Sequence, residues 1–182
     1  MAAGHEDGRY SVWSISSGRL IGTLAAASQT IWGIALSPRD DTVFVCCGQN
    51  IRSWDVRRMK GSGTILPSDT LPTSSSGLVS GYVSVAVDAT GQYLAAATTL
   101  GTLDIWEHRR GQPVECRGRV SIPRNVARVQ FGPLRASRGE RALYAATGDG
   151  VVVVDISSLS VARTIAMATA TDVDGRQVAT GS

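Results

Sequence analysis

The chain has 182 residues, 43% of them apolar, and a formal net charge of +3. This size allows one compact domain with a hydrophobic core, and the apolar content argues against a disordered chain. No apolar run approaches the roughly 18 residues that span a bilayer, and residues 1–7 lack the basic start and apolar run of a secretory signal. We therefore expect an intracellular protein, cytoplasmic or nuclear, without contact with membranes.

One pattern of six residues recurs four times along the chain. It reads Tyr-Ser-Val-Trp-Ser-Ile at 10–15, Ile-Arg-Ser-Trp-Asp-Val at 51–56, Leu-Asp-Ile-Trp-Glu-His at 103–108 and Val-Val-Val-Val-Asp-Ile at 151–156. The starts lie 41, 52 and 48 residues apart, which fits a repeat of about 40 residues with inserted loops. Each copy alternates and is rich in β-branched and aromatic residues, so each predicts a β-strand.

Further strands and turns are predicted around each copy. A strand precedes it at 1–3, 43–47, 93–97, 143–147 and, as a fifth copy, 178–182. Turns rich in Gly, Asp and Asn separate these two strands at 6–8, 48–50, 100–102 and 148–150. An earlier strand is predicted at 32–36, 83–87 and 127–131, and a last strand at 18–24, 113–116 and 161–165. The predicted unit is therefore four short antiparallel strands.

These units resemble the WD-repeat family of β-propellers. Trp54-Asp55 is the dipeptide that names the family, and weakened versions stand at 13–14, 106–107 and 154–155. The Gly-His pair that opens such repeats is missing from its usual place, since residues 4–5 fall between a second and a third strand. The resemblance implies an all-β fold of propeller blades, each a four-stranded antiparallel sheet held mainly by apolar packing.

Six residues are assigned to this architecture and not to a site: Trp13, Trp54, Asp55, Trp106, Asp149 and Asp155. The indole rings are expected to pack between blades, and the aspartates to occupy turns and strand ends.

The blade-like units are expected at 1–28, 29–80, 81–122 and 123–166, with a partial fifth unit at 167–182. The chain starts inside a second strand and stops at the end of one. Resembling propellers mostly close with seven blades, so we expect an arc of a larger ring, with the rest missing or on another chain. An unusual small closed ring is the alternative. Open strand edges and apolar faces of an arc would invite a partner.

Two insertions are predicted to be loops. Residues 57–80 are rich in Ser, Thr, Gly and Pro and predict a flexible loop. Its start, at 57–62, is a candidate substrate for a kinase that prefers basic residues near its target. A solvated loop is the alternative. Residues 133–141 predict a basic loop between the first and second strands of their unit.

Two aromatic residues, Trp32 and Tyr82, lie at the starts of first strands. In resembling proteins this edge borders the channel mouth, where peptides dock. Both residues are therefore candidate anchors for a partner protein, and packing in the core is the alternative for each.

The positive charge is concentrated between residues 107 and 141, where nine arginines meet three glutamates. Four of them, Arg117, Arg119, Arg124 and Arg128, are predicted to cluster around one connection between strands. Guanidinium groups bind phosphate and carboxylate through paired hydrogen bonds, so the patch predicts contact with RNA or an acidic protein. The absence of interleaved aromatic residues weakens the RNA interpretation, and a solvated surface is the further alternative.

Catalytic and metal-binding patterns are absent from the sequence. His5 and His108 have no metal-ligand spacing, and no nucleophile elbow or phosphate-binding glycine loop occurs. Cys46, Cys47 and Cys116 form no disulfide framework and are expected to be reduced. We expect no cofactor and no small-molecule substrate. The leading interpretation is a non-enzymatic scaffold that docks other proteins of a large eukaryotic complex; an RNA-associated propeller is the alternative, and a propeller enzyme comes third.

Overall fold

The computed structural model describes residues 1–25, 29–58, 60–65, 77, 80–109, 112, 114–122, 125–133 and 141–166. Within these residues every regular element is a β-strand. The described part of the chain therefore contains no helix of the length and hydrophobicity needed to cross a membrane.

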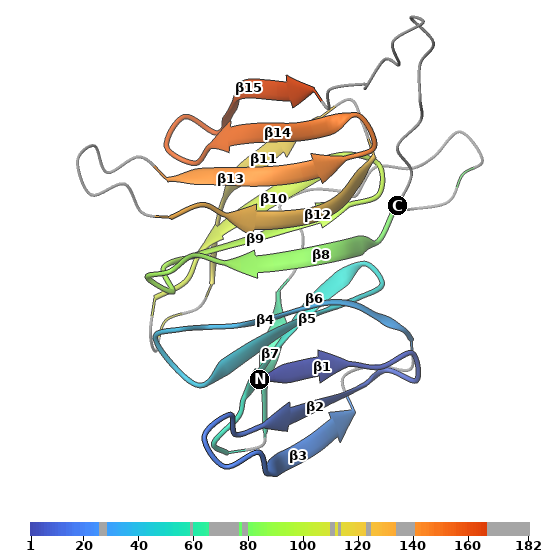
Figure 1. The fold of residues 1–182 in the computed structure, drawn as a ribbon, viewed down its shortest axis with the longest axis vertical. Helices are drawn as coiled ribbons and strands as arrows, with labels where there is room; N and C mark the ends of the chain where they lie inside the picture. The colour runs from blue at the N-terminus through green and yellow to red at the C-terminus, as the bar shows by residue number, and fades with distance from the viewer. Residues whose placement is uncertain are drawn as a thin grey trace, which may run out of the picture.

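The strands form four antiparallel sheets that follow one another along the chain (Figure 1). The first sheet has three strands, β1 (Ala2–Gly4), β2 (Arg9–Trp13) and β3 (Leu20–Ala25). The second contains β4 (Ile31–Leu36), β5 (Thr42–Cys47), β6 (Asn50–Asp55) and β7 (Lys60–Ile65). The third contains β8 (Tyr82–Val87), β9 (Tyr93–Thr98), β10 (Thr102–Glu107) and β11 (Glu115–Ser121). The fourth contains β12 (Val126–Phe131), β13 (Ala142–Thr147), β14 (Gly150–Asp155) and β15 (Ser160–Ala166).

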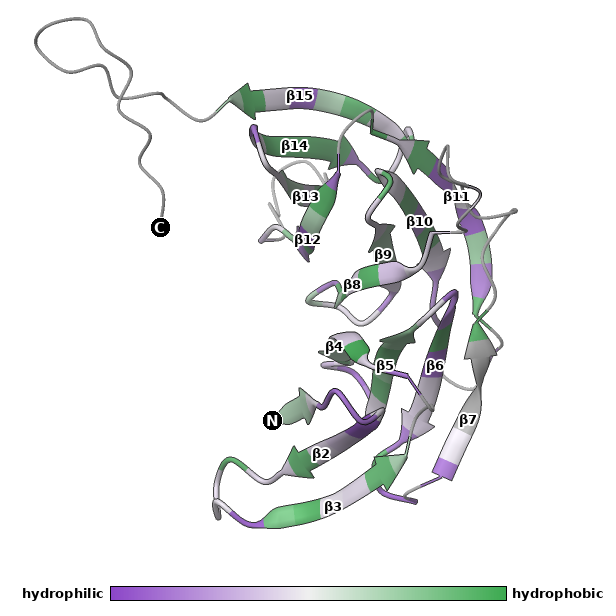
Figure 2. Cartoon of the chain, turned by 90° about the vertical axis from the view of Figure 1, so that its right-hand side faces the viewer, coloured by the Kyte–Doolittle hydropathy of each residue, from purple (hydrophilic) through white to green (hydrophobic). Residues whose placement is uncertain are grey.

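Each complete sheet has its strands side by side in chain order, which is the arrangement of a propeller blade. The predicted all-β fold of blades is thus confirmed. The first sheet has three strands in the described part of the chain, without a counterpart of β4, β8 and β12, as the sequence predicts for a chain that starts inside a second strand. Figure 2 shows the sheets as an arc, with β4, β8 and β12 on its concave side and β3, β7, β11 and β15 on its convex side.

Tight turns connect the second strand of each sheet to the third. Gly48 and Gly101 adopt φ values of 60° and 81° in these turns, a region that residues with a Cβ rarely enter. The turns set the register of the third strands, which carry the repeated six-residue pattern.

The hydrophobic core is divided into three clusters, one between each pair of neighbouring sheets. Tyr10 and Val12 of the first sheet meet Trp54 and Val56 of the second. The next two clusters join the second sheet to the third and the third to the fourth in the same way. We call the side of a sheet that faces the preceding sheet its front face, and the side that faces the following sheet its back face.

Two sequence predictions about loops and strands need correction. Residues 57–80 were expected to form one flexible loop, but β7 lies within them and pairs along β6. The last strand of the third unit, expected at 113–116, extends instead over Glu115–Ser121 as β11. The expected fifth unit at 167–182 lies outside the described residues, as does most of the predicted loop at 133–141.

Candidate interaction surface on the concave side

The concave side of the arc contains a groove of about 350 Å³. The inner strands β4, β8 and β12 line it together with Gly4 of β1, and it includes Trp32 and Arg128. Two of the residues singled out in the sequence therefore meet on one surface, although 96 positions separate them.

The inner strands lie unusually close together beneath this groove. A Cβ atom on Gly33 of β4 would stand 3.0 Å from the Cα atom of Ser84 in β8. The hydroxyl of Ser84 in turn accepts a hydrogen bond of 3.1 Å from the backbone N–H of Val129 in β12. Small residues at these positions let three backbones pack against one another, so the groove has a fixed floor.

A β-bulge occurs at the same place in every inner strand. In the pairing of β4 with β5, Ile31 is opposite Cys47 and Gly33 is opposite Cys46, so Trp32 is the extra residue. The extra residues of β8 and β12 are Val83 and Ala127. A bulge redirects a side chain that would otherwise alternate toward the core. Trp32, Val83 and Ala127 are accordingly all directed into the groove.

Trp32 is the most prominent of these residues, since 66% of its surface is exposed. Its neighbour Ile31 is buried in the cluster between the first two sheets. The indole therefore does not serve the core of the described protein, and it offers a large, rigid apolar surface that loses little conformational entropy on binding.

Tyr82, the second aromatic anchor expected from the sequence, is fully buried and cannot contact a partner. Its structural counterpart is Ile31 and not Trp32, because Tyr82 comes directly before the bulge residue Val83, as Ile31 comes directly before Trp32. The tyrosine ring packs edge-on against Trp106 with a centroid distance of 6.1 Å. Tyr82 is thus a core residue between the second and third sheets, as the alternative interpretation held.

A buried polar network surrounds the hydroxyl of Tyr82. This hydroxyl donates a hydrogen bond to Asp104, whose carboxylate is fully buried. Arg119 holds the same carboxylate through Nε at 2.6 Å and Nη2 at 2.9 Å. Burial, and then the hydrogen bond to Asp104, raise the pKa of Tyr82. The network joins an inner, a middle and an outer strand of one sheet, so its role is structural.

The predicted arginine cluster is not one surface. Arg117 and Arg119 lie on β11, on the convex side, whereas Arg128 lies on the inner strand β12 (Figure 2). Arg119 is committed to Asp104, and Arg117 is exposed with Glu107 at 3.9 Å. Arg128 is exposed and makes no ion pair within the described residues. Arg124 lies outside the described residues.

The residues assigned to the repeat occupy the blade framework. Trp54 and Trp106 are buried on front faces, while Trp13 is only half-buried on the front face of the first sheet. Asp55 accepts a hydrogen bond of 2.9 Å from the backbone N–H of Arg58, and Asp155 one of 2.8 Å from that of Ser157. These two carboxylates hold the turns after the third strands.

Asp149 lies in the turn between β13 and β14. Among the residues that the structure describes, no group of three or more His, Cys, Asp or Glu side chains is arranged to hold a metal ion.

Sequence reasoning missed the roles of Asp104 and His108. His108 is buried against Phe44 of the preceding sheet, with its Nε2 atom 3.7 Å from a carboxylate oxygen of Asp40. A charged residue at the centre of an apolar strand such as 102–107 is the one sequence signal that pointed to Asp104.

Comparison with known proteins gives partial matches at low identity. No model of a protein family matches the chain. It is 25% identical over 113 residues to autophagy-related protein 16 of Arabidopsis thaliana, covering 62% of this chain and 21% of that protein. It is 38% identical over 76 residues to Shk1 kinase-binding protein 15 of Schizosaccharomyces pombe, covering 41% and 22%. It is 34% identical over 76 residues to the methylosome protein WDR77 of Xenopus laevis, covering 40% and 23%.

The chain thus spans about a fifth of the length of these curated relatives. Among solved structures, it resembles hydrazine synthase of Kuenenia stuttgartiensis with a TM-score of 0.59 and 17% sequence identity, over 80% of this chain and 40% of that one. At this identity the similarity concerns the fold alone.

Proposed function

We propose that this protein is a non-enzymatic WD-repeat scaffold that binds other proteins within a multiprotein complex, and that the concave groove is its docking site. The observation that carries this proposal is Trp32, which a bulge turns out of the sheet and leaves 66% exposed. Aromatic side chains in a depression are the residues that most often dominate the free energy of protein association. The name of one relative, a kinase-binding protein, refers to binding of another protein.

The groove favours a partner segment with a negative charge. Arg128 is the charged residue among those that line it, and no carboxylate is present among them. An extended peptide that places an apolar side chain on Trp32 and a carboxylate near Arg128 would satisfy both groups. The proposed setting is the cytoplasm or the nucleus, where the free cysteines, including the exposed Cys116, stay reduced.

The RNA-associated alternative has less support. A single-stranded nucleic acid requires a continuous basic track with aromatic platforms. The described arginines are instead divided between the convex and concave sides, and Arg119 is already paired with a buried carboxylate. An enzyme remains the third alternative, without a described residue cluster that favours it.

Peptide selection against the whole chain tests the groove directly. Short extended peptides are selected from a displayed library, and their affinities are measured for the wild type, Trp32→Ala and Arg128→Ala. We expect acidic and apolar peptides to be enriched. Trp32→Ala should weaken them by about 30-fold, the loss of a hot-spot aromatic, and Arg128→Ala by several-fold with a reduced salt dependence.

Two matched variants serve as controls in this experiment. Leu100→Ala removes another exposed apolar side chain, from the turn between β9 and β10, and Arg117→Ala removes an exposed arginine from the convex side. Both should bind the selected peptides as the wild type does. Peptides that bind equally to Trp32→Ala would refute the groove as the docking site. Binding of a single-stranded RNA oligonucleotide that Arg117→Ala abolishes would favour the RNA alternative.

A further inference from the structure

The two end faces of the arc have the residue types of an interface between sheets. On the front faces of the second, third and fourth sheets, the residue two positions after the repeated Trp or Val is buried: Val56, His108 and Ile156. The corresponding residue of the first sheet is Ile15, which is 82% exposed. Trp13, beside it, is half-buried, whereas its counterparts Trp54 and Trp106 are buried.

The back face of the fourth sheet shows the same contrast. Val151 is half-buried, whereas its counterparts Tyr10, Ile51 and Leu103 are fully buried beneath the next sheet. Opposite Val151 on β15 lies Ile165, which is 45% exposed. In the two preceding sheets this position holds a buried residue: Ile65 and Val120.

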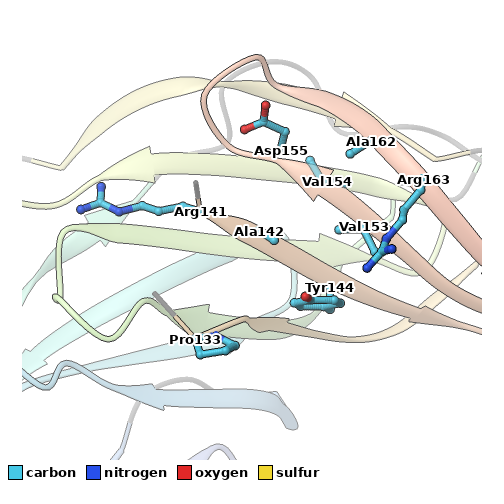
Figure 3. A pocket seen from close by; sticks show the side chains of 9 residues that line it. All are labelled: Pro133, Arg141, Ala142, Tyr144, Val153, Val154, Asp155, Ala162 and Arg163. Carbon is cyan, nitrogen blue, oxygen red and sulfur yellow. The ribbon is translucent and has the colours of Figure 1, made fainter. Parts of the chain in front are cut away.

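A cavity of about 420 Å³ lies on this back face, lined by Tyr144, Val153, Arg163 and neighbouring residues (Figure 3). Tyr144 occupies the position of Phe44 in the second sheet. There the ring of His108, from the following sheet, packs edge-on against Phe44 with a centroid distance of 5.3 Å. The counterpart of His108 on the first sheet is Ile15. The exposed front face of the arc thus carries an apolar side chain, Ile15, at the position that would cover Tyr144.

The geometry points to a second copy of this chain as the occupant of both faces: we propose that two copies associate head to tail, the front face of each first sheet packing on the back face of the other's fourth sheet. The contact continues an interface that the chain already builds three times. Two such contacts are related by one two-fold axis and close a ring. The ring has eight sheets, within the range known for propellers and one more than the seven that the resemblance implies.

The size of Arg128 favours docking of the three-stranded first sheet on the fourth sheet over docking of a sheet that has an inner strand. Its counterparts on β4 and β8 are Gly33 and Ser84, which are small because the next inner strand lies against them. An arginine does not fit such a contact. Among the described residues the first sheet has no inner strand, so its docking beside β12 leaves room for the guanidinium group.

The mass of the chain in solution tests this proposal. Light scattering and sedimentation velocity over a concentration series should show a species of twice the monomer mass of 19.1 kDa. Ile15→Glu on the front face and Ile165→Glu on the back face should each return the protein to 19.1 kDa, since a carboxylate would be buried without a partner. Both residues are exposed within one copy, so circular dichroism should show an unchanged fold.

Mixing the two variants distinguishes a head-to-tail contact from a symmetric one. In the mixture the unaltered back face of the Ile15→Glu variant can pack on the unaltered front face of the Ile165→Glu variant. Dimers held by this single contact should therefore reappear. Leu100→Glu, at an exposed position outside both faces, is the matched control and should remain dimeric. A wild-type chain that stays at the monomer mass throughout overturns the proposal, whether or not another protein covers these faces. A dimer that survives both substitutions also overturns it, because another surface must then form the contact.

Discussion

The contact between the second and third sheets and the open back face of the fourth sheet are built from the same positions of the repeat. At the first, Phe44, Ile51 and Ile65 are buried beneath Trp106. At the second, the corresponding Tyr144 and Val151 are half-buried and Ile165 is 45% exposed. The residue types hardly differ, so exposure reports the presence of a neighbouring sheet and not the nature of the strand. The two ends of such a repeat therefore expose apolar faces that can pack against a further sheet.

The largest effect should come from the repeated tryptophan. Trp106→Ala removes a buried indole from the core between the second and third sheets and should lower the free energy of unfolding by about 3–5 kcal/mol. Trp13→Ala changes the same repeat position at an open face and should cost about 1 kcal/mol or less.

Urea unfolding, followed by circular dichroism, measures both losses. The comparison is made in the Ile15→Glu background, which keeps the front face of the first sheet free of a second copy. Equal losses at the two positions would show that Trp13 is as firmly packed as Trp106, which contradicts the distinction between inner and end faces.

A smaller loss is expected from the polar network of Tyr82, Asp104 and Arg119 within the third sheet. Asp104→Asn leaves Arg119 without its charge partner in a largely buried site and should cost about 3 kcal/mol. Asp155→Asn, in the turn after β14, weakens hydrogen bonds to Ser157 and Ser158 at a more exposed position and should cost less than about 1 kcal/mol.

A double variant separates the charge from the space it fills. Asp104→Leu with Arg119→Met should be less destabilised in urea than Asp104→Leu alone, because the pair is then removed without leaving a buried charge. If the double variant is the less stable of the two, Arg119 stabilises the sheet by packing and not through Asp104.

Much of the fold could be predicted from the sequence because its determinants are local. Alternation and turn residues placed the third strands at 10–15, 51–56, 103–108 and 151–156, and β2, β6, β10 and β14 lie there. The strand β7 escaped detection because Lys60–Ile65 contains two glycines and weak strand formers. Its extended conformation depends on pairing with β6, and the sequence of the segment alone does not indicate that pairing.

The candidate site could be predicted only in part, for two physical reasons. Trp32 and Tyr82 look alike in sequence but differ completely in exposure, because Trp32 is the bulge residue of its strand whereas Tyr82 comes directly before the bulge residue of its own. Residues close in sequence also separate when one lies on an outer strand and the next on an inner strand. That separation places Arg119 and Arg128 on opposite sides of the arc, and neither strand indicates it by itself.

The smallest effect concerns stability at high pH. It tests whether the contacts between neighbouring sheets exclude water, unlike the end faces. Burial raises the pKa of Tyr10 and of Tyr82, the latter also through its hydrogen bond to Asp104. The unfolded chain releases these protons near pH 10, whereas the native state retains them. The native state then binds more protons, so stability present below about pH 10 is lost as the pH rises, by at most about 1.4 kcal/mol per unit for each group.

Urea unfolding between pH 9 and 11 should therefore show a slope for the wild type that becomes shallower in a Tyr10→Phe, Tyr82→Phe variant. Tyrosinate absorbance of the wild type should reach its full value only as the near-ultraviolet circular dichroism of the folded state disappears. Full absorbance while the native signal persists would mean that these two hydroxyls ionise within the folded protein. The inner interfaces would then be open to water, and the contrast with the end faces would be one of degree.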